Sequence, residues 1–265
     1  TVMDNELVTF SSGDIWNTTS TTWFWNELGP DPEINYIRFF AYAPYDEMQD
    51  NDWITWYETA TGTPSFHYTI PADVNEQIDI AAKAVDAPGD FYRSVPLQFE
   101  HLLTGVRFLV DDEYMAKQLQ KITIRGVYGE GDYKYPTEPD DVSTPNDDDK
   151  YKRGEWTQTG DTVSFVLSRD KGDFLVKPML DELDKDGDRW CITDADHTLL
   201  MLPQQLPEGA IVIFEFEDEE QPVLYGKLDF KEVTQTNPDG TPTDGPQHTW
   251  KQGYIVTYFI QTFDI

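Results

Sequence analysis

The chain has 265 residues, of which 19 are Lys or Arg and 50 are Asp or Glu, so its formal net charge at pH 7 is −31. A surface this acidic repels DNA, RNA and anionic lipid headgroups, which argues against a nucleic-acid-binding or membrane-surface protein. Aromatic residues make up 14% of the chain and its one cysteine is Cys191, so we expect a folded protein without an internal disulfide or a cysteine metal cluster.

Short runs rich in Val, Ile, Thr and aromatic residues alternate with Gly- and Pro-containing turns, a pattern typical of many short β-strands. Helical periodicity is limited to Glu113–Lys121 and Met179–Lys185. Because strands do not alternate with long amphipathic helices, the pattern favours an antiparallel sandwich over a parallel α/β sheet. In chain order, the predicted strands are Leu7–Phe10, Thr21–Trp25, Tyr36–Ala43, Ile54–Tyr57, Phe66–Ile70, Ile78–Ala84, Val95–Phe99, Val106–Val110, Ile122–Tyr128, Thr162–Leu167, Phe174–Lys177, Trp190–Thr193, Leu199–Leu202, Ile211–Phe216, Leu224–Phe230 and Tyr254–Phe263.

The turn-rich stretch Asp86–Ser94 separates two apolar runs, and we predict a domain boundary there. The prediction gives an N-terminal domain of residues 1–92 and a C-terminal domain of residues 93–265. Residues 133–156 of the second domain hold three prolines and three consecutive aspartates with few apolar side chains. We therefore expect a long surface insertion there.

No catalytic motif stands out in the sequence. The four histidines, His67, His101, His197 and His248, have no metal-ligand spacing, and neither a zincin helix, a Gly-rich phosphate loop nor a Gly-x-Ser-x-Gly elbow occurs. For each histidine we favour a strand residue whose ring nitrogen is satisfied locally. Carboxylate pairs at glycosidase spacing arise by chance among 50 acids, so a glycosidase stays an open alternative that no sequence feature supports. We therefore expect no catalytic residue and no cofactor.

Asp184, Asp186 and Asp188 stand at every second position of an acidic turn, an arrangement that suits a hard cation such as Ca²⁺. Gly187 does not stand where an EF-hand loop requires its glycine. A solvated turn is therefore the favoured interpretation, and the three aspartates are weak metal candidates.

Five tryptophans crowd the first quarter of the chain: Trp16, Trp23, Trp25, Trp53 and Trp56. Exposed aromatic rings form stacking platforms for sugars, so a surface glycan-binding module using Trp or Tyr is an alternative function. Trp23 and Trp25 share one face of a predicted strand, which favours a place in the core for these two.

Six segments, taken in order, resemble signature segments of the fimbrillin-like surface proteins of Bacteroidetes. They are Phe39–Tyr45 (FFAYAPY), Gln77–Ala82 (QIDIAA), Val95–Phe108 (VPLQFEHLLTGVRF), Ile122–Val127 (ITIRGV), Leu202–Leu206 (LPQQL) and Trp250–Tyr254 (WKQGY). These segments span most of the chain, and their shared order carries the resemblance.

The resemblance implies a mainly β protein with two antiparallel, transthyretin-like β-sandwich domains of Greek-key type. It also implies a non-enzymatic subunit of a fimbrium (type V pilus) at the cell surface and outer membrane, exported as a lipoprotein precursor and assembled by strand exchange. A chain that starts at Thr1 without a leader fits a processed form. The implied partners are other copies of the chain, related fimbrial subunits, and a glycan or protein on a host or bacterial surface.

The C-terminal segment is the best candidate for the exchanged strand. Its apolar residues lie on both faces, as expected of a strand buried from two sides, and they continue to the last residue. The alternative is a central strand of the chain's own domain, and the sequence leaves both open. The candidate donor residues are Tyr254, Val256, Tyr258, Ile260, Phe263 and Ile265.

Overall fold

The computed structural model describes residues 5–12, 15–18, 36–49, 51–57, 62–88, 94–110, 113–142, 152–174, 177–178, 190–193, 198–217, 223–228, 234–236, 242–243 and 249–260. Within these residues the protein is mainly β, and most strand pairs are antiparallel. The exceptions are two parallel pairs, β10 with β6 and β21 with β8. The sequence prediction of a mainly β, antiparallel fold is confirmed at this level.

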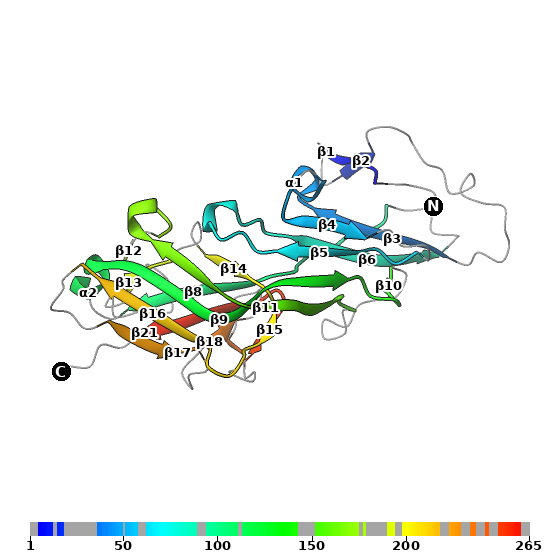
Figure 1. The fold of residues 1–265 in the computed structure, drawn as a ribbon. Coiled ribbons are helices and arrows are strands. Elements are labelled where there is room, and N and C mark those ends of the chain that lie inside the picture. The colour runs from blue at the N-terminus through cyan, green and yellow to red at the C-terminus, as the bar shows by residue number, and fades with distance from the viewer. Residues whose placement is uncertain are drawn as a thin grey trace.

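One long sheet runs through the middle of the molecule (Figure 1). Along one side, its central strand β9 pairs with β11 over almost the whole length of both strands. On the other side, the first half of β9 pairs with β16 and its second half with β5. The strands of this sheet are β4 (Ile54–Tyr57), β5 (Ser65–Thr69), β9 (Leu119–Lys134), β11 (Glu155–Ser168), β16 (Ile211–Phe216) and β17 (Leu224–Lys227).

Two smaller sheets face opposite ends of this long sheet (Figure 1). The first consists of β3 (Tyr36–Ala43), β6 (Ala81–Pro88), β7 (Glu100–His101) and β10 (Asp140–Asp141). The second consists of β8 (Thr104–Val110), β12 (Lys177–Pro178), β13 (Trp190–Cys191), β14 (Leu199–Met201), β18 (Thr234–Thr236), β19 (Pro242–Thr243) and β21 (Ile255–Ile260).

Aromatic contacts show that the sheets pack face to face. The rings of Tyr42 on β3 and Trp56 on β4 lie 4.9 Å apart between centroids. At the other end, Phe108 on β8 and Phe214 on β16 meet edge to face at 5.6 Å. The ring quadrupole favours edge-to-face and offset-stacked pairs over a perfect face-to-face sandwich. The buried side chains of both ends form one connected core.

The remaining elements are short. Two further sheets have two strands each, β1 (Val8–Ser12) with β2 (Ile15–Thr18) and β15 (Gln204–Gln205) with β20 (Thr249–Trp250). In the part of the chain that the structure describes, no helix has both the length and the apolar character needed to cross a bilayer. The helices are α1 (Tyr45–Gln49), α2 (Glu113–Gln118) and the 3₁₀ turns Val74–Glu76 and Arg169–Lys171.

Glycines allow β9 and β11 to continue past the middle of the sheet. The register slips by one residue at Gly126 on β9 and again at Gly160 on β11. Both glycines have left-handed backbone, with φ of 81° and 66°. Such bulges bend a strand and increase its twist. We infer that the two bulges turn the long sheet from one facing sheet towards the other.

Most predicted strands are present with shifted ends. Three of the predicted ranges agree with β3, β4 and β16 residue for residue. The helix predicted at Glu113–Lys121 is present as α2, but it ends at Gln118 and Leu119–Lys121 belong to β9. Val95–Phe99 forms no strand, because Pro96 lacks the N–H that a ladder needs and disfavours pairing inside a sheet. Predictions for Thr21–Trp25 and Met179–Lys185 lie outside the described residues.

The predicted boundary between residues 92 and 93 stays a prediction. Two features bear on how the parts connect. The second half of β9 pairs with β5, and Asp140–Asp141 pairs with β6, so strands that follow the boundary in sequence lie beside strands that precede it. Within the segment expected to be a surface insertion, Tyr133 and Tyr135 are buried in the core.

Candidate functional site

The C-terminal strand β21 lies inside a sheet of its own chain. It runs parallel to β8 over its whole length, from the Ile255–Gly105 pair to the Ile260–Val110 pair. On its other side it pairs with the three residues of β18. Val256 and Tyr258 are buried. Among the described residues, β21 is therefore flanked on both sides by strands of its own chain.

Tyr258 anchors β21 in the core. Its ring stacks on Phe108 of β8, with centroids 5.7 Å apart. Its hydroxyl donates a hydrogen bond to the Leu228 carbonyl oxygen at 3.0 Å and accepts one from Trp250 Nε1 at 2.9 Å. A buried tyrosine hydroxyl needs such partners, because burial removes its hydrogen bonds to water and an unpaired hydroxyl forms none in their place.

A tight turn, Lys251–Tyr254, leads into β21. Gly253 has φ of 74°, which favours glycine, and its N–H donates to the Leu103 carbonyl oxygen at 3.0 Å. The Thr104 hydroxyl donates to the Lys251 carbonyl oxygen at 2.8 Å. The turn is therefore held to the start of β8 by backbone and side-chain hydrogen bonds.

The candidate donor residues fall into three groups. Val256 and Tyr258 are buried and Ile260 is the last residue of β21. Tyr254 is half-buried in the turn. Phe263 and Ile265 lie outside the described residues. Of the two interpretations left open by the sequence, the central-strand position is the one that a single chain adopts here, and donation to a neighbour stays a prediction.

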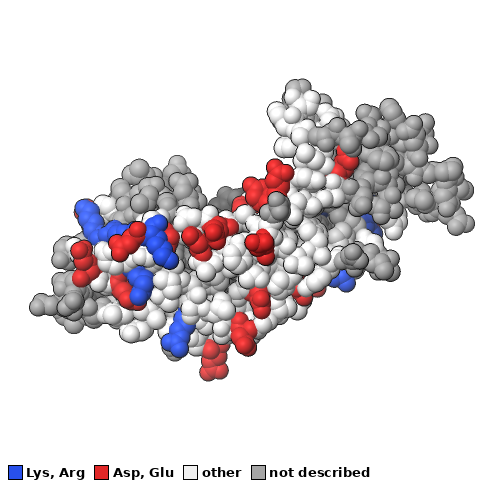
Figure 2. Space-filling view, turned by 45° about the horizontal axis from the view of Figure 1, so that its top comes forward, with Lys and Arg blue, Asp and Glu red and all other residues white. Residues whose placement is uncertain are grey.

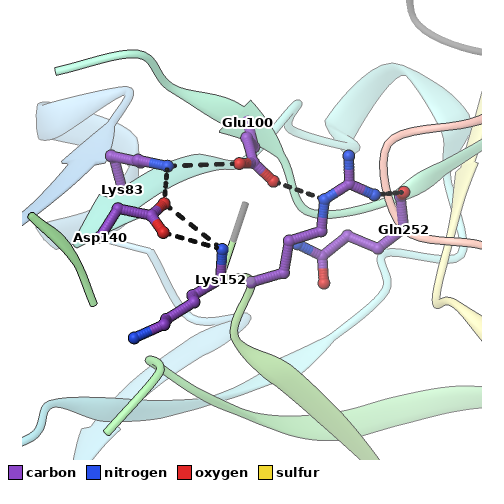
Figure 3. A network of polar contacts seen from close by, with 6 residues as sticks. Lys83, Glu100, Asp140, Lys152 and Gln252 are labelled. Carbon is purple, nitrogen blue, oxygen red and sulfur yellow. Dashed lines mark hydrogen bonds and ion pairs between the residues drawn. The ribbon is translucent and has the colours of Figure 1, made fainter. Parts of the chain in front are cut away.

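A charged network lies close to the turn before β21 (Figure 3). Lys83 on β6 points its ammonium group at two carboxylates, with Nζ 3.1 Å from Asp140 Oδ2 and 3.4 Å from Glu100 Oε1. The backbone N–H of Lys152 donates to both oxygens of Asp140 at 3.3 Å. The network thus ties together β6, β7, β10 and the residues that precede β11.

Arg153 extends this network to the C-terminal part of the chain. Its Nε lies 2.7 Å from Glu100 Oε2, and one of its terminal nitrogens donates to the Gln252 carbonyl oxygen at 3.4 Å. Gln252 belongs to the turn before β21 (Figure 3). Burial raises the pKa of nearby Tyr133, and the charge of Glu100 raises that pKa further. Charged side chains therefore connect the first small sheet to the turn that precedes β21.

The two described histidines bind carboxylates. His67 on β5 has its Nδ1 2.8 Å from Asp132 Oδ1, and the Tyr57 hydroxyl donates to the same oxygen at 2.7 Å. His101 has its Nδ1 2.9 Å from Asp79 Oδ1, and this hydrogen bond raises the pKa of His101 above its ordinary value. Both agree with the interpretation of locally satisfied strand histidines. His197 and His248 lie outside the described residues.

The metal candidates Asp184, Asp186 and Asp188 lie outside the described residues. Within the residues that are described, no three His, Cys, Asp or Glu side chains are grouped so that they could hold a metal ion. The Sγ atom of Cys191 donates a hydrogen bond to the Thr193 carbonyl oxygen at 3.0 Å.

The early tryptophans divide between core and surface. Trp53 and Trp56 pack against the core. Trp16 on β2 is 63% exposed and meets Phe10 on β1, 57% exposed, edge to face at 5.7 Å. Trp23 and Trp25 lie outside the described residues. The β1–β2 hairpin therefore presents two exposed aromatic rings that contact each other.

On the face that Figure 2 shows, acidic and basic side chains are unevenly distributed. Figure 2 shows carboxylates along the visible face from one end to the other, with basic side chains interspersed mainly at the end that holds α2. Two ion pairs there are Lys117 with Glu113 and Lys121 with Glu215. The excess negative charge disfavours contact between identical faces of two copies.

The sequence pattern does not predict the charged network. Its residues come from distant positions, since Lys83 and Asp140 are separated by 57 residues. One signal was available: Lys83 stands alone in the apolar run Ala81–Val85, where a charge without a partner would be costly. Its carboxylate partners could not be identified without the strand pairing.

A family model described as fimbrillin-like matches residues 1–262 of the chain. Two crystal structures are similar, each of a protein described as a "putative cell adhesion protein". The first, from Bacteroides uniformis, has 13% identity and a TM-score of 0.46, with 86% of this chain and 68% of that chain covered. The second, from Bacteroides thetaiotaomicron, has 13% identity and a TM-score of 0.36, with 99% and 81% covered. No match was found among curated proteins.

Proposed function

Because the chain belongs to the fimbrillin-like family, we propose that it is a non-enzymatic structural or adhesion subunit of a fimbrium at the bacterial cell surface. The proposed mode of assembly is strand exchange between subunits, with β21 as the exchanged strand. The observation that carries this proposal is the place of β21, an apolar strand that lies between β8 and β18 inside its sheet.

The proposed architecture is a pair of transthyretin-like sandwiches that share the long sheet. One sandwich would consist of the β3–β6–β10 sheet and the β4–β5 end of the long sheet. The other would consist of the β8–β21 sheet and the β16–β17 end. The face-to-face contacts Tyr42–Trp56 and Phe108–Phe214 support this division.

Strand exchange requires β21 to leave the sheet of its own chain. Its departure would expose the backbone edges of β8 and β18 and the apolar groove that holds Val256 and Tyr258. An open groove of this kind favours any strand that restores the pairing. The same strand from a second copy restores it fully, since every side-chain contact is then repeated between subunits.

The turn Lys251–Tyr254 is the proposed hinge. Exchange requires this turn to open into an extended connection, because β21 must reach a neighbouring subunit. Gly253 makes that change possible at low cost, since a glycine populates both left-handed and extended backbone. The hydrogen bonds of the turn to Leu103 and Thr104 would be lost when the turn opens, so they contribute to the activation barrier for strand exchange.

A disulfide between β8 and β21 tests the exchange. Arg107 and Thr257 are register partners in the parallel pair, so cysteines at both positions can bridge the strands. In a Cys191→Ser background, we expect the oxidised Arg107→Cys/Thr257→Cys variant to form no filaments, and reduction to restore them. Negative-stain electron microscopy and size-exclusion chromatography, under conditions in which the unmodified chain polymerises, measure the outcome.

The matched control places a disulfide elsewhere in the fold. Ile213 and Tyr225 are register partners in the β16–β17 pair, away from β21. The Ile213→Cys/Tyr225→Cys variant should polymerise in both redox states. Filaments of normal length from the oxidised β8–β21 variant would remove β21 as the donor.

The β1–β2 hairpin supports a second candidate function, glycan binding. The exposed rings of Phe10 and Trp16 offer apolar faces of the kind on which sugar rings stack. We expect the Phe10→Ala/Trp16→Ala variant to lose at least about tenfold in affinity for a polysaccharide that the chain binds, as the loss of more than about 1.4 kcal/mol of contact energy requires. Isothermal calorimetry measures this, with Tyr225→Ala, a change of an exposed aromatic residue on β17, as control. Absence of binding across a panel of host and plant polysaccharides would end this proposal.

A further inference from the structure

A lysine and two carboxylates meet inside the protein with little access to solvent. The side chains of Lys83, Asp140 and Glu100 are 4%, 10% and 18% exposed. We propose that Lys83 Nζ and the Asp140 carboxyl group condense to an intramolecular amide, an isopeptide bond, with Glu100 as the proton acceptor. The chemistry needs no bound cofactor, and the proposal does not depend on whether the chain assembles into fibres.

Position favours the reaction. Asp140 on β10 is the register partner of Val85 on β6, two residues from Lys83, and the parallel pairing of these strands holds the two side chains together. Nζ and Oδ2 are already 3.1 Å apart. Holding two reacting groups in this way replaces a bimolecular encounter by an intramolecular one, which removes a large part of the entropic barrier.

Burial favours the product. An ion pair inside a protein keeps two charges out of water at a considerable desolvation cost, which their attraction does not always repay. Amide formation turns the ammonium and the carboxylate into one neutral group and releases water. The net charge of the chain is unchanged, because one positive and one negative charge disappear together.

Glu100 and the Lys152 backbone are placed for the two steps. Glu100 Oε1 lies 3.4 Å from Lys83 Nζ, while Arg153 holds the other oxygen, Oε2, at 2.7 Å. The carboxylate is therefore oriented with one oxygen towards the nucleophile. The Lys152 N–H, at 3.3 Å from both Asp140 oxygens, is placed to stabilise the negative charge that develops on oxygen during the attack.

The reaction balances without an oxidant or a reductant. Lys83 first gives one ammonium proton to Asp140 Oδ2, so that a neutral amine faces a neutral carboxyl group. The nitrogen lone pair attacks Cγ of Asp140 to form the C–N bond, and Glu100 accepts a second proton from the nitrogen. The tetrahedral intermediate then breaks one C–O bond: the hydroxyl that carries the first proton takes the second from Glu100 and leaves as water, and the nitrogen keeps the third. Glu100 is regenerated as a carboxylate.

The mass of the intact protein tests the proposal. We expect the folded, purified chain to weigh less than its calculated mass by one water molecule, and a proteolytic digest to contain one branched peptide that joins residues 83 and 140. An intact mass equal to the calculated one after prolonged incubation of the folded chain would overturn the proposal, whatever any variant does.

Four variants assign the roles. Lys83→Arg and Asp140→Ala should both show the full calculated mass. Asp140→Asn should form the same amide with loss of ammonia instead of water. Glu100→Gln keeps both reacting groups, and its rate of water loss should fall by about 10²-fold or more if Glu100 is the general base. Cross-linking of Glu100→Gln at the normal rate would overturn the role of Glu100. Circular dichroism verifies that each variant is folded.

The surface pair Lys121–Glu215 is the matched control within the same molecule. Its Nζ–Oε1 distance is 2.5 Å, shorter than that of Lys83 and Asp140, but its side chains are 38% and 39% exposed. We expect no branched peptide that joins residues 121 and 215. A cross-link there at a similar yield would contradict the argument that burial drives the reaction.

Discussion

Replacing Phe108 with alanine should lower the free energy of unfolding by about 3–5 kcal/mol. Phe108 is fully buried on β8, and its ring contacts Phe214 of the long sheet at 5.6 Å and Tyr258 of β21 at 5.7 Å. Truncation removes both aromatic contacts and leaves a cavity that the surrounding strands cannot fill. Urea denaturation followed by tryptophan fluorescence measures the change, provided that the m-value is unaltered.

The control for this prediction is an aromatic residue of the same type at the surface. Phe10→Ala removes a side chain that is largely exposed on the β1–β2 hairpin, and its expected effect on the free energy of unfolding lies within about 0.5 kcal/mol. If Phe108→Ala lowered the free energy of unfolding by no more than Phe10→Ala does, then β8, β16 and β21 would not enclose a common core.

The strands that the sequence predicts best are those with a clear local pattern. In Ile211–Phe216, Val212 and Phe214 are buried and alternate with residues that are partly exposed, as a strand with one face in the core requires. Tyr36–Ala43 and Ile54–Tyr57 carry similarly dense runs of β-branched and aromatic residues. At these positions the local β-propensity and the need to bury apolar side chains favour the same structure, so the sequence pattern alone predicts the strand.

The length of β9 and β11 could not be predicted in this way. Gly129, Gly131 and their acidic neighbours in the second half of β9 resemble a turn, and the prediction ends at Tyr128. The structure continues the strand to Lys134 because β5 and β11 pair with it on either side. Pairing with distant strands outweighs the weak local preference of glycine, and a single sequence does not reveal such pairing.

The candidate site was predictable only in part. The apolar run that ends the chain indicated a strand buried on both sides, and β21 has this property at Val256 and Tyr258. The charged network was not predictable, because its existence depends on β10 lying beside β6 and on β7 pairing with β6. In a chain with 50 acidic residues, no sequence pattern distinguishes Glu100 and Asp140 from the others.

The network and the C-terminal strand are physically connected. Arg153 binds Glu100 through one nitrogen and the Gln252 carbonyl oxygen through another, and Gln252 lies in the turn that would open on strand exchange. Opening of the turn would remove one partner of Arg153, but the pair with Glu100 would remain in place. The network thus holds the first small sheet together whether β21 stays in its own subunit or is donated.

The second large effect is expected from Lys83→Met. The change removes the positive charge that lies between the buried Asp140 and the partly exposed Glu100, so Asp140 loses its ion-pair partner while Glu100 keeps its pair with Arg153. Breaking a buried pair by removing one partner is expected to lower the free energy of unfolding by about 3–5 kcal/mol. The direction is the same whether Lys83 and Asp140 are joined as an ion pair or as an amide. Chemical denaturation at neutral pH measures it.

Lys121→Met supplies the comparison, because Lys121 pairs with Glu215 across β9 and β16 at the surface. Exposed pairs contribute little, since water screens them and two long side chains must be ordered, so a loss below about 1 kcal/mol is expected. A double change, Lys83→Met with Asp140→Leu, removes one buried carboxylate together with its partner and should recover part of the stability lost in Lys83→Met. If Lys83→Met and Lys121→Met lowered the free energy of unfolding equally, water would have to reach the network. Burial could then not explain why the network stabilises the fold.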